Sequence, residues 1–245
     1  MPDPPPITGP AEEMQEETRW RGDLLTVATR ISHDLRTPLG SITNTCEMLK
    51  EVAAEADPAS AQLFNPVFQG ADEVARLLER VSLVLKASAN PEPKRLVPMA
   101  EPVSIALQRL ERRILAQKAT VRQPPDWPVV SGVSRWLEVI WWNFIVNALQ
   151  HGKEAPQIEL GWARAGNGGF HFTVEDDGKG VAAEIRSRLF QPFHTLHKMN
   201  STRGLGLSIV QRLVELQGGA CGYEPGAGRT RFFFSLPAAC QNVEK

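Results

Sequence analysis

The sequence contains few cysteines and carries almost no net charge. Three cysteines are scattered over 245 residues, and the formal net charge is −1. The cysteines have no metal-binding spacing, and three widely separated residues imply no disulfide framework, which favours a reducing compartment. Because positive and negative charges balance, the composition argues against a chain built to bind nucleic acid or a membrane surface.

The sequence also lacks a segment that is long and apolar enough to cross a bilayer. The most apolar window is WLEVIWWNFIVNAL, residues 136–149, which Glu138, Asn143 and Asn147 interrupt. At the N-terminus there is no basic region followed by an apolar run, so no signal peptide is visible. We therefore expect a soluble, cytoplasmic chain without a membrane span.

What is present is a strongly helical first third. Residues 1–10 carry five prolines and are expected to be disordered. A long helix is predicted over about 11–54 and a second over about 59–88, with a break at 56–58. Two such helices form a hairpin that cannot bury both apolar stripes alone, so the pattern predicts a four-helix bundle made by two copies. The stripe of the second helix steps by three and four residues: Phe64, Val67, Ala71, Val74, Leu78, Val81 and Leu85.

Prolines within 89–98 end the helical region, and we place a domain boundary there. This assigns residues 11–90 to the hairpin and 91–240 to a second domain, in which helices alternate with strands. The pattern predicts an α/β sandwich with helices on one face of a mixed sheet, and hence an α+β chain. Helices are predicted near 103–118, 134–150, 182–189 and 204–217, and strands near 94–98, 119–122, 156–163, 170–176, 219–224 and 229–236.

Two asparagines interrupt the apolar helix near 134–150 and need polar partners. Asn143 and Asn147 lie four residues apart and therefore on one face. A buried amide without a partner costs about 1–3 kcal/mol. Two interpretations remain open from the residues alone: the amides bond neighbouring backbone groups, or they meet a hydrated metal ion and phosphate oxygens.

A first glycine-containing segment could shape a ligand pocket. It is VEDDGKGV, residues 174–181, directly after an alternating strand. Gly178 and Gly180 permit close backbone approach to a ligand, and Asp176 could accept a hydrogen bond from an exocyclic amine. The alternative is a plain turn, because Asp-Gly is a common turn dipeptide.

A second glycine-containing segment is TRGLGLSIV, residues 202–210. Gly204 and Gly206 open a helix whose free N–H groups could bind an anion, although a close packing contact would explain the same glycines. Lys198 and Arg203 could meet phosphate charge or be ordinary solvated surface charges.

The first helix carries polar residues that could perform chemistry. His33 and Thr37 are four residues apart on one face, and Asp34 is adjacent to His33, about 100° around the helix. These residues could simply form the exposed polar face of a bundle helix. Alternatively, the imidazole is a nucleophile and the neighbouring carboxylate is its base or orienting group.

Taken in order, these segments resemble the catalytic core of a bacterial sensor histidine kinase of a two-component system. ISHDLRTPL resembles the H box of that family, NFIVNA the N box, DDGKG the first glycine box, LFQPF the F box and RGLGLSIV the second glycine box. The resemblance covers roughly residues 20–238. It implies a dimerisation and histidine-phosphotransfer hairpin followed by a GHKL-type ATP-binding domain, the kind shared with gyrase and Hsp90.

The resemblance implies roles for three residues of the hairpin. His33 would accept the γ-phosphoryl group of ATP, Asp34 would be its general base, and Thr37 would position water for dephosphorylation of the phosphorylated partner.

The resemblance also implies an ATP and Mg²⁺ site in the second domain. Asn147 would coordinate Mg²⁺, Asn143 would assist at the phosphates, and Asp176 would recognise the adenine amine. The other cofactor-binding candidates are His151, Gly178, Gly180, Lys198, Arg203, Gly204, Leu205 and Gly206.

The sequence departs from the family pattern in two places. Gln150 and His151 stand where the N box often has a lysine and an aromatic residue, which removes one phosphate cation; Lys198, Arg203 or His151 could replace it. The lid before the second glycine box is also short, and a threonine stands there where many relatives have glycine.

The implied function is that of an ATP-dependent protein-histidine kinase that autophosphorylates His33 and transfers the phosphoryl group to an aspartate of a response-regulator receiver domain. A non-catalytic phosphotransfer or scaffold dimer and a gyrase- or Hsp90-like ATPase are the alternatives. About 20 residues precede the region of resemblance, which is too few for a sensor domain. The chain is therefore expected to be an excised core, to take its signal from a separate sensor protein, or to have lost its sensor.

Overall fold

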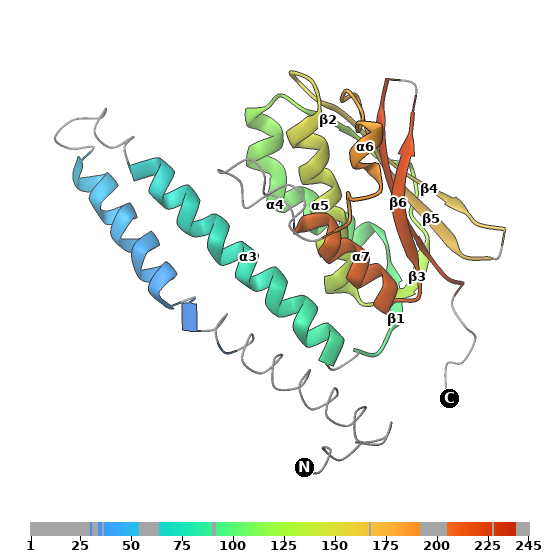
Figure 1. Ribbon diagram of the computed structural model, residues 1–245, viewed down its shortest axis with the longest axis horizontal. Coiled ribbons are helices and arrows are strands. Elements are labelled where there is room, and N and C mark those ends of the chain that lie inside the picture. The colour runs from blue at the N-terminus through green and yellow to red at the C-terminus, as the bar shows by residue number, and fades with distance from the viewer. Residues whose placement is uncertain are drawn as a thin grey trace, which may run out of the picture. The chain divides into compact units, whose positions relative to one another are not determined.

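The chain consists of two compact units, Met1–Asn90 and Pro91–Lys245 (Figure 1). The computed structural model describes residues 30, 34–35, 37–53, 64–89, 92–166, 168–191, 205–226 and 228–238. Three expectations fall outside these residues: disorder over 1–10, the first part of the long helix, and the break at 56–58.

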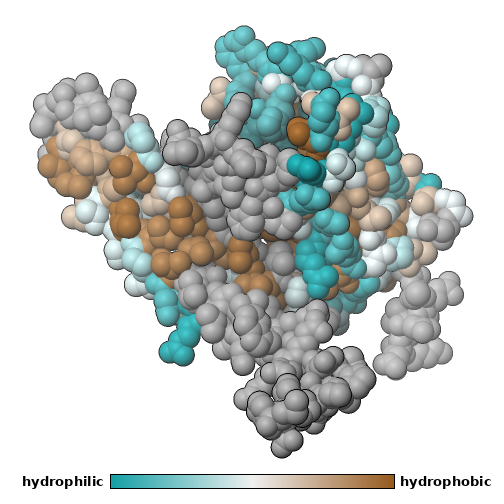
Figure 2. Space-filling view, in the orientation of Figure 1, coloured by the Kyte–Doolittle hydropathy of each residue, from teal (hydrophilic) through white to brown (hydrophobic). Residues whose placement is uncertain are grey.

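The described part of the first unit is helical, as predicted. Residues 37–53 form one helix that runs through Pro38, and α3 covers Asn65–Ala89. Several apolar side chains of these helices are exposed in a single copy: Leu35, Ile42, Met48, Leu49, Val52, Val67 and Val74. Figure 2 shows hydrophobic surface along the helices of this unit.

The second unit contains a five-stranded mixed sheet in the order β2-β4-β5-β7-β6. Strand β2 pairs in parallel with β4, and the other neighbours pair antiparallel. The strands are β2 Thr120–Arg122, β4 Gln157–Arg164, β5 Phe170–Asp176, β6 Ala220–Pro225 and β7 Thr230–Leu236. All five were predicted to within about one residue.

Three helices cover one face of this sheet, which confirms the predicted α+β sandwich (Figure 1). They are α4 Ala100–Ala116, α5 Ser134–His151 and α7 Gly206–Leu216. Helix α5 contacts both α4 and α7. Its side chains are buried on almost every side, and Trp141 meets the rings of Phe172 and Phe234 edge-on, with ring centroids 6.0 and 5.4 Å away.

Strand alternation determines which residues face the helices. Along β5 every second side chain is buried, from Phe170 through Phe172 and Val174 to Asp176. Strand β7 pairs with β5 so that Thr230 lies opposite Asp176. The apolar face of the sheet therefore ends in a buried polar pair.

Two elements differ from the sequence prediction. Strand β3, Val129–Gly132, was not predicted; it pairs antiparallel with β1, Arg95–Pro98, in a separate two-stranded sheet. The predicted helix over 182–189 is only the short α6, Ala183–Arg186. Within the described residues, no helix has the length and apolarity that a membrane crossing needs.

The end of α7 is tied to the start of the second unit through Gln217. Its side chain is fully buried, and its Oε1 accepts a hydrogen bond from the amide of Val133 at 3.0 Å, while its Nε2 donates to the carbonyl of Leu213 at 3.1 Å. The ammonium of Lys94 donates to the backbone carbonyl of Gln217 at 2.7 Å. Three segments far apart in sequence therefore meet at one residue.

Candidate functional site

Asp176 is a buried carboxylate at the end of a strand. Its side chain is 1% exposed, and its Oδ1 accepts a hydrogen bond from the amide of Gly178 at 2.8 Å. The Thr230 side chain also donates a hydrogen bond to it. Burial raises the pKa of Asp176 to about 6, although both hydrogen bonds oppose the shift. The carboxylate is therefore held in place and is mostly ionised at neutral pH.

The loop after Asp176 lies against the end of α5. A Cβ atom at Gly178 would come within 2.6 Å of the His151 carbonyl oxygen and 2.5 Å of Asp176 Oδ1, so only glycine fits there. The amide of Lys153, just beyond α5, donates to Asp177 Oδ1 at 3.3 Å. Gly180 has φ +75°, a conformation that favours glycine. Gly178 therefore packs closely against the backbone of α5, and close approach of a ligand to these glycines stays a prediction.

Helix α5 carries Asn143, Asn147 and His151 in steps of four residues along one side. Asn143 is buried, and its Nδ2 donates to the Val139 carbonyl at 2.7 Å, so the backbone-bonding interpretation holds for that half of the amide. Asn147 is half-buried, and His151 is exposed at the C-terminal end. The three side chains become progressively more accessible toward the loop after Asp176.

Helix α7 begins against Asn143. A Cβ atom at Gly206 would lie 2.8 Å from Asn143 Oδ1, so the absence of a side chain lets the helix start next to the amide. Leu205 precedes the helix and is half-buried, and its carbonyl accepts a hydrogen bond from the Ser208 hydroxyl at 2.9 Å. The start of α7, the polar side of α5 and the loop after β5 are therefore connected by direct contacts.

The remaining predicted site residues divide into two groups. Asp34 and Thr37 are exposed helical residues of the first unit, and the Thr37 carbonyl accepts a hydrogen bond from the Ser41 hydroxyl at 3.2 Å. Four predicted site residues lie outside the described residues: His33, Lys198, Arg203 and Gly204.

Two residues next to this site were not predicted from the sequence. Thr230 contacts Asp176 from β7, and Tyr223 on β6 accepts a hydrogen bond at its Oη from the Val181 amide at 3.1 Å. A signal for Thr230 was available, because it occupies an inward position in an otherwise apolar alternating strand, Thr230 to Leu236. No comparable signal marks Tyr223, since its contact depends on how β6 lies beside the loop.

The chemistry of the donors is compatible with a magnesium–nucleotide complex. Among the described residues, no group of three or more His, Cys, Asp or Glu side chains could hold a metal ion by itself. Mg²⁺ is commonly bound by one or two protein oxygens together with substrate phosphates. The side-chain oxygen of Asn147 would be one such ligand, and the start of α7 favours anions.

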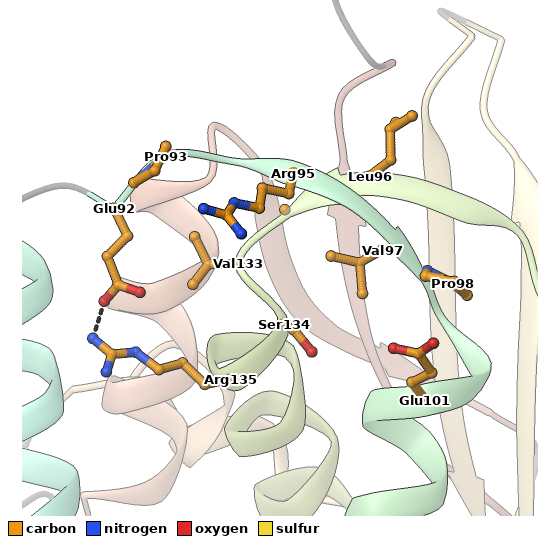
Figure 3. Close-up of a pocket in the computed structure, with 11 residues that line it drawn as sticks. Glu92, Pro93, Arg95, Leu96, Val97, Pro98, Glu101, Val133, Ser134 and Arg135 are labelled. Atoms are coloured by element: carbon orange, nitrogen blue, oxygen red, sulfur yellow. Dashed lines mark hydrogen bonds and ion pairs between the residues drawn. The ribbon is translucent and has the colours of Figure 1, made fainter.

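A hollow of about 500 Å³ lies elsewhere in the second unit, along β1 and the start of α5 (Figure 3). Leu96, Val97 and Ser134 contribute to its lining, and Glu92 forms an ion pair with Arg135 at its border. None of its lining residues is a predicted site residue.

Comparison with protein families gives two matches. Residues 23–89 match the His Kinase A (phospho-acceptor) domain, and residues 132–239 match the histidine kinase-, DNA gyrase B-, and HSP90-like ATPase family. The first match lies within the predicted hairpin of 11–90 and contains α3, and the second contains α5, β5 and α7.

Curated relatives show the same relationship. The chain is 30% identical to the sensor protein KdpD of Clostridium acetobutylicum over 91% of its own length and 25% of that protein. It is 27% identical to cyanobacterial phytochrome A of Nostoc sp. over 93% of its length and 30% of that protein. The chain thus spans about a quarter to a third of the length of these relatives.

Solved structures are similar as well. The crystal structure of full-length ShkA in complex with AMPPNP matches 86% of this chain and 45% of that one, with a TM-score of 0.67 and 25% identity. The mycobacterial sensor histidine kinase MprB matches 58% of this chain and 97% of that one, with a TM-score of 0.52 and 25% identity. The two family matches together cover most of the chain, which therefore contains the catalytic core of the two-component sensor histidine kinases, with their phosphoacceptor domain and their ATP-binding domain.

Proposed function

We propose that the chain is an ATP-dependent protein-histidine kinase that phosphorylates His33 and passes the phosphoryl group to an aspartate of a response-regulator receiver domain. The observation that carries the proposal is that helix α5 meets two predicted segments on one side: the start of α7 lies against Asn143, and the loop after Asp176 lies against its C-terminal end. Because residues 132–239 match the ATPase family, we infer that this side of α5 binds ATP.

Nucleotide recognition would begin at Asp176. An ionised carboxylate, held by Gly178 and Thr230, can accept a hydrogen bond from the exocyclic amine of adenine. The backbone at Gly178 and Gly180 lacks side chains, so the base can approach closely.

The phosphates would lie between α5 and the start of α7. Asn147 would hold Mg²⁺ with Asn143 assisting at the phosphates, and the N–H groups at Gly204, Leu205 and Gly206 would face the anionic oxygens. The bound metal would neutralise phosphate charge during transfer.

A cation from this chain would supplement the metal at the phosphates. A substitute is needed because Gln150 stands where the family often has lysine. The candidates are His151 at the end of α5, Lys198 and Arg203.

The transfer itself is a displacement at phosphorus. A nitrogen of the His33 imidazole would attack the γ-phosphorus, forming a P–N bond as the bond to the ADP oxygen breaks, and Asp34 would accept the proton of the other ring nitrogen. The reaction requires mainly alignment and charge neutralisation. Thr37, one turn away, would position a water molecule when the phosphorylated regulator is hydrolysed.

We further propose that the chain acts as a homodimer through its helical hairpin. Val67 and Val74 of the predicted apolar stripe are 52% and 38% exposed in a single copy. A second copy would bury them in a four-helix bundle.

The test is incubation with γ-labelled ATP and Mg²⁺. We expect acid-labile, base-stable label on the wild type and none on His33→Gln. His171→Gln is the matched control, because His171 lies on the other sheet face, stacked on Phe233 with ring centroids 4.8 Å apart. Absence of label on the wild type would contradict the kinase proposal, and label on His33→Gln would show that another residue is the acceptor.

A binding measurement separates the kinase from a scaffold. Asp176→Asn should lose nucleotide binding, while Asp126→Asn, in an exposed loop, should retain it. A wild type that binds no nucleotide at all would favour a non-catalytic phosphotransfer dimer.

A further inference from the structure

Val181, the residue after Gly180, has both of its backbone polar groups hydrogen-bonded to side chains. The amide of Val181 donates to Tyr223 Oη at 3.1 Å, and the carbonyl of Val181 accepts a hydrogen bond from Arg186 Nε at 2.9 Å. The guanidinium of Arg186 also lies over the Tyr223 ring, 5.6 Å from its centroid. Each of these three residues therefore contacts the other two.

Strand β6 places the Tyr223 hydroxyl next to Gly180 and Val181, in the loop that follows Asp176. The ring of Tyr223 packs against Phe232 of the neighbouring strand, with centroids 5.6 Å apart. Its Oη lies 3.3 Å from the position that a Cβ atom at Gly180 would occupy. The hydroxyl thus contacts the segment that begins at Asp176 from the side of β6.

We propose that Tyr223 is a positioning residue for the adenine pocket and that Arg186 supports it. The proposal rests on the proposed function, in which Asp176, Gly178 and Gly180 shape that pocket. A loop with two glycines has many accessible conformations, and ordering it on binding would reduce affinity. Hydrogen bonds at both the amide and the carbonyl of Val181 hold the loop in its binding conformation beforehand, so less ordering remains for the nucleotide to impose.

Tyr223→Phe tests the positioning role of Tyr223, because it removes only the hydroxyl group and keeps the ring. The ring can still pack on Phe232 and beneath Arg186, so the fold is preserved. We expect the affinity for ADP and for a non-hydrolysable ATP analogue to fall by about three- to tenfold alike, the usual effect of one hydrogen bond. The KM for ATP should rise by the same factor while the autophosphorylation rate at saturating ATP is unchanged.

Hydrogen exchange supplies a second, direct measurement. The Val181 amide should exchange faster in Tyr223→Phe than in the wild type, because its acceptor is gone. Arg186→Met, which removes the donor to the Val181 carbonyl, should weaken nucleotide binding in the same direction.

Ser235→Ala is the matched control. The Ser235 hydroxyl also bonds the backbone, at both the amide and the carbonyl of Ala220 at 3.2 Å, but at the other end of the same strand pair. Removing it should leave nucleotide affinity and Val181 exchange unchanged.

The outcomes separate this proposal from the proposed function. Unchanged affinity or unchanged Val181 exchange in Tyr223→Phe, with binding still lost in Asp176→Asn, would overturn the role of Tyr223 alone. A lower saturating rate with unchanged KM would also overturn it, because the hydroxyl would then act in phosphoryl transfer. A wild type that binds no nucleotide would show that the adenine pocket does not exist, and both proposals would then be wrong. The chain has a single tyrosine, so any tyrosine-specific label reports this position only.

Discussion

At the scale of single residues, Asp176 is held in an environment that disfavours its charge. Burial raises its pKa to about 6, whereas an unperturbed aspartate titrates near 3.8. Between these values the folded chain binds a proton that the unfolded chain has released. This proton-linked stabilisation is complete below about pH 3.8, decreases as the pH rises, and is lost above about pH 6.

Asp176→Asn should therefore become more stable relative to the wild type as the pH rises from 4 to 7. Asparagine resembles the protonated carboxyl group and does not ionise. A difference of about two pKa units corresponds to about 3 kcal/mol. Urea unfolding of both proteins at several pH values measures it. Parallel stability curves over this range would show that the pKa of Asp176 is not raised by folding.

The sequence predicted much of the candidate site at this scale but not all of it. Asp176, Gly178, Asn143 and Gly206 belong to local segments with recognisable chemistry, and the structure places Gly178 against Asp176 and Gly206 against Asn143. Thr230 is different, because its contact with Asp176 follows from the pairing of β5 with β7 rather than from its own neighbours.

At the scale of elements, errors in the sequence prediction have local physical causes. Strand β3 has only four residues and follows the proline-rich stretch before Val129, so it shows too few residues for an alternating pattern. Helix α4 begins at Ala100 rather than near 103, because Pro102 lies in the first turn, where its missing N–H group is tolerated. Both features depend on their surroundings more than on local periodicity.

The hydrogen bond between Gln217 at the end of α7 and Val133 before α5 can be tested for its contribution to stability. Gln217→Ala would leave the buried amide of Val133 without its acceptor and open a small cavity. We expect a loss of about 1–3 kcal/mol in the free energy of unfolding of the second unit. Thermal and urea unfolding measure this loss. Gln211→Ala, at an exposed position of the same helix, should change stability little, and an equal loss in both variants would contradict a special role for Gln217.

At the scale of the whole molecule, the hairpin exposes apolar side chains that a second copy would cover. Val67→Glu should therefore weaken the dimer. In a symmetric interface each substitution appears twice, and each buried valine contributes roughly 1.5–3 kcal/mol, so we expect at least about a hundredfold loss of dimer affinity.

Sedimentation over a concentration series measures this change. The control is Val129→Glu, because Val129 in the second unit is also 52% exposed and receives the same new charge. Val129→Glu should remain dimeric, and a Val67→Glu variant that also remains dimeric would place the interface elsewhere.

The contacts of Lys94 have a consequence for how such chains can be recombined. Lys94 reaches the end of α7, and Glu92 pairs with Arg135, so both residues belong structurally to the ATP-binding unit although they lie next to the end of α3. A fusion that replaces the upstream part of the chain should therefore be joined before Glu92. A junction placed a few residues later would remove Lys94, and the transplanted unit would lose the hydrogen bond from that ammonium to the end of α7.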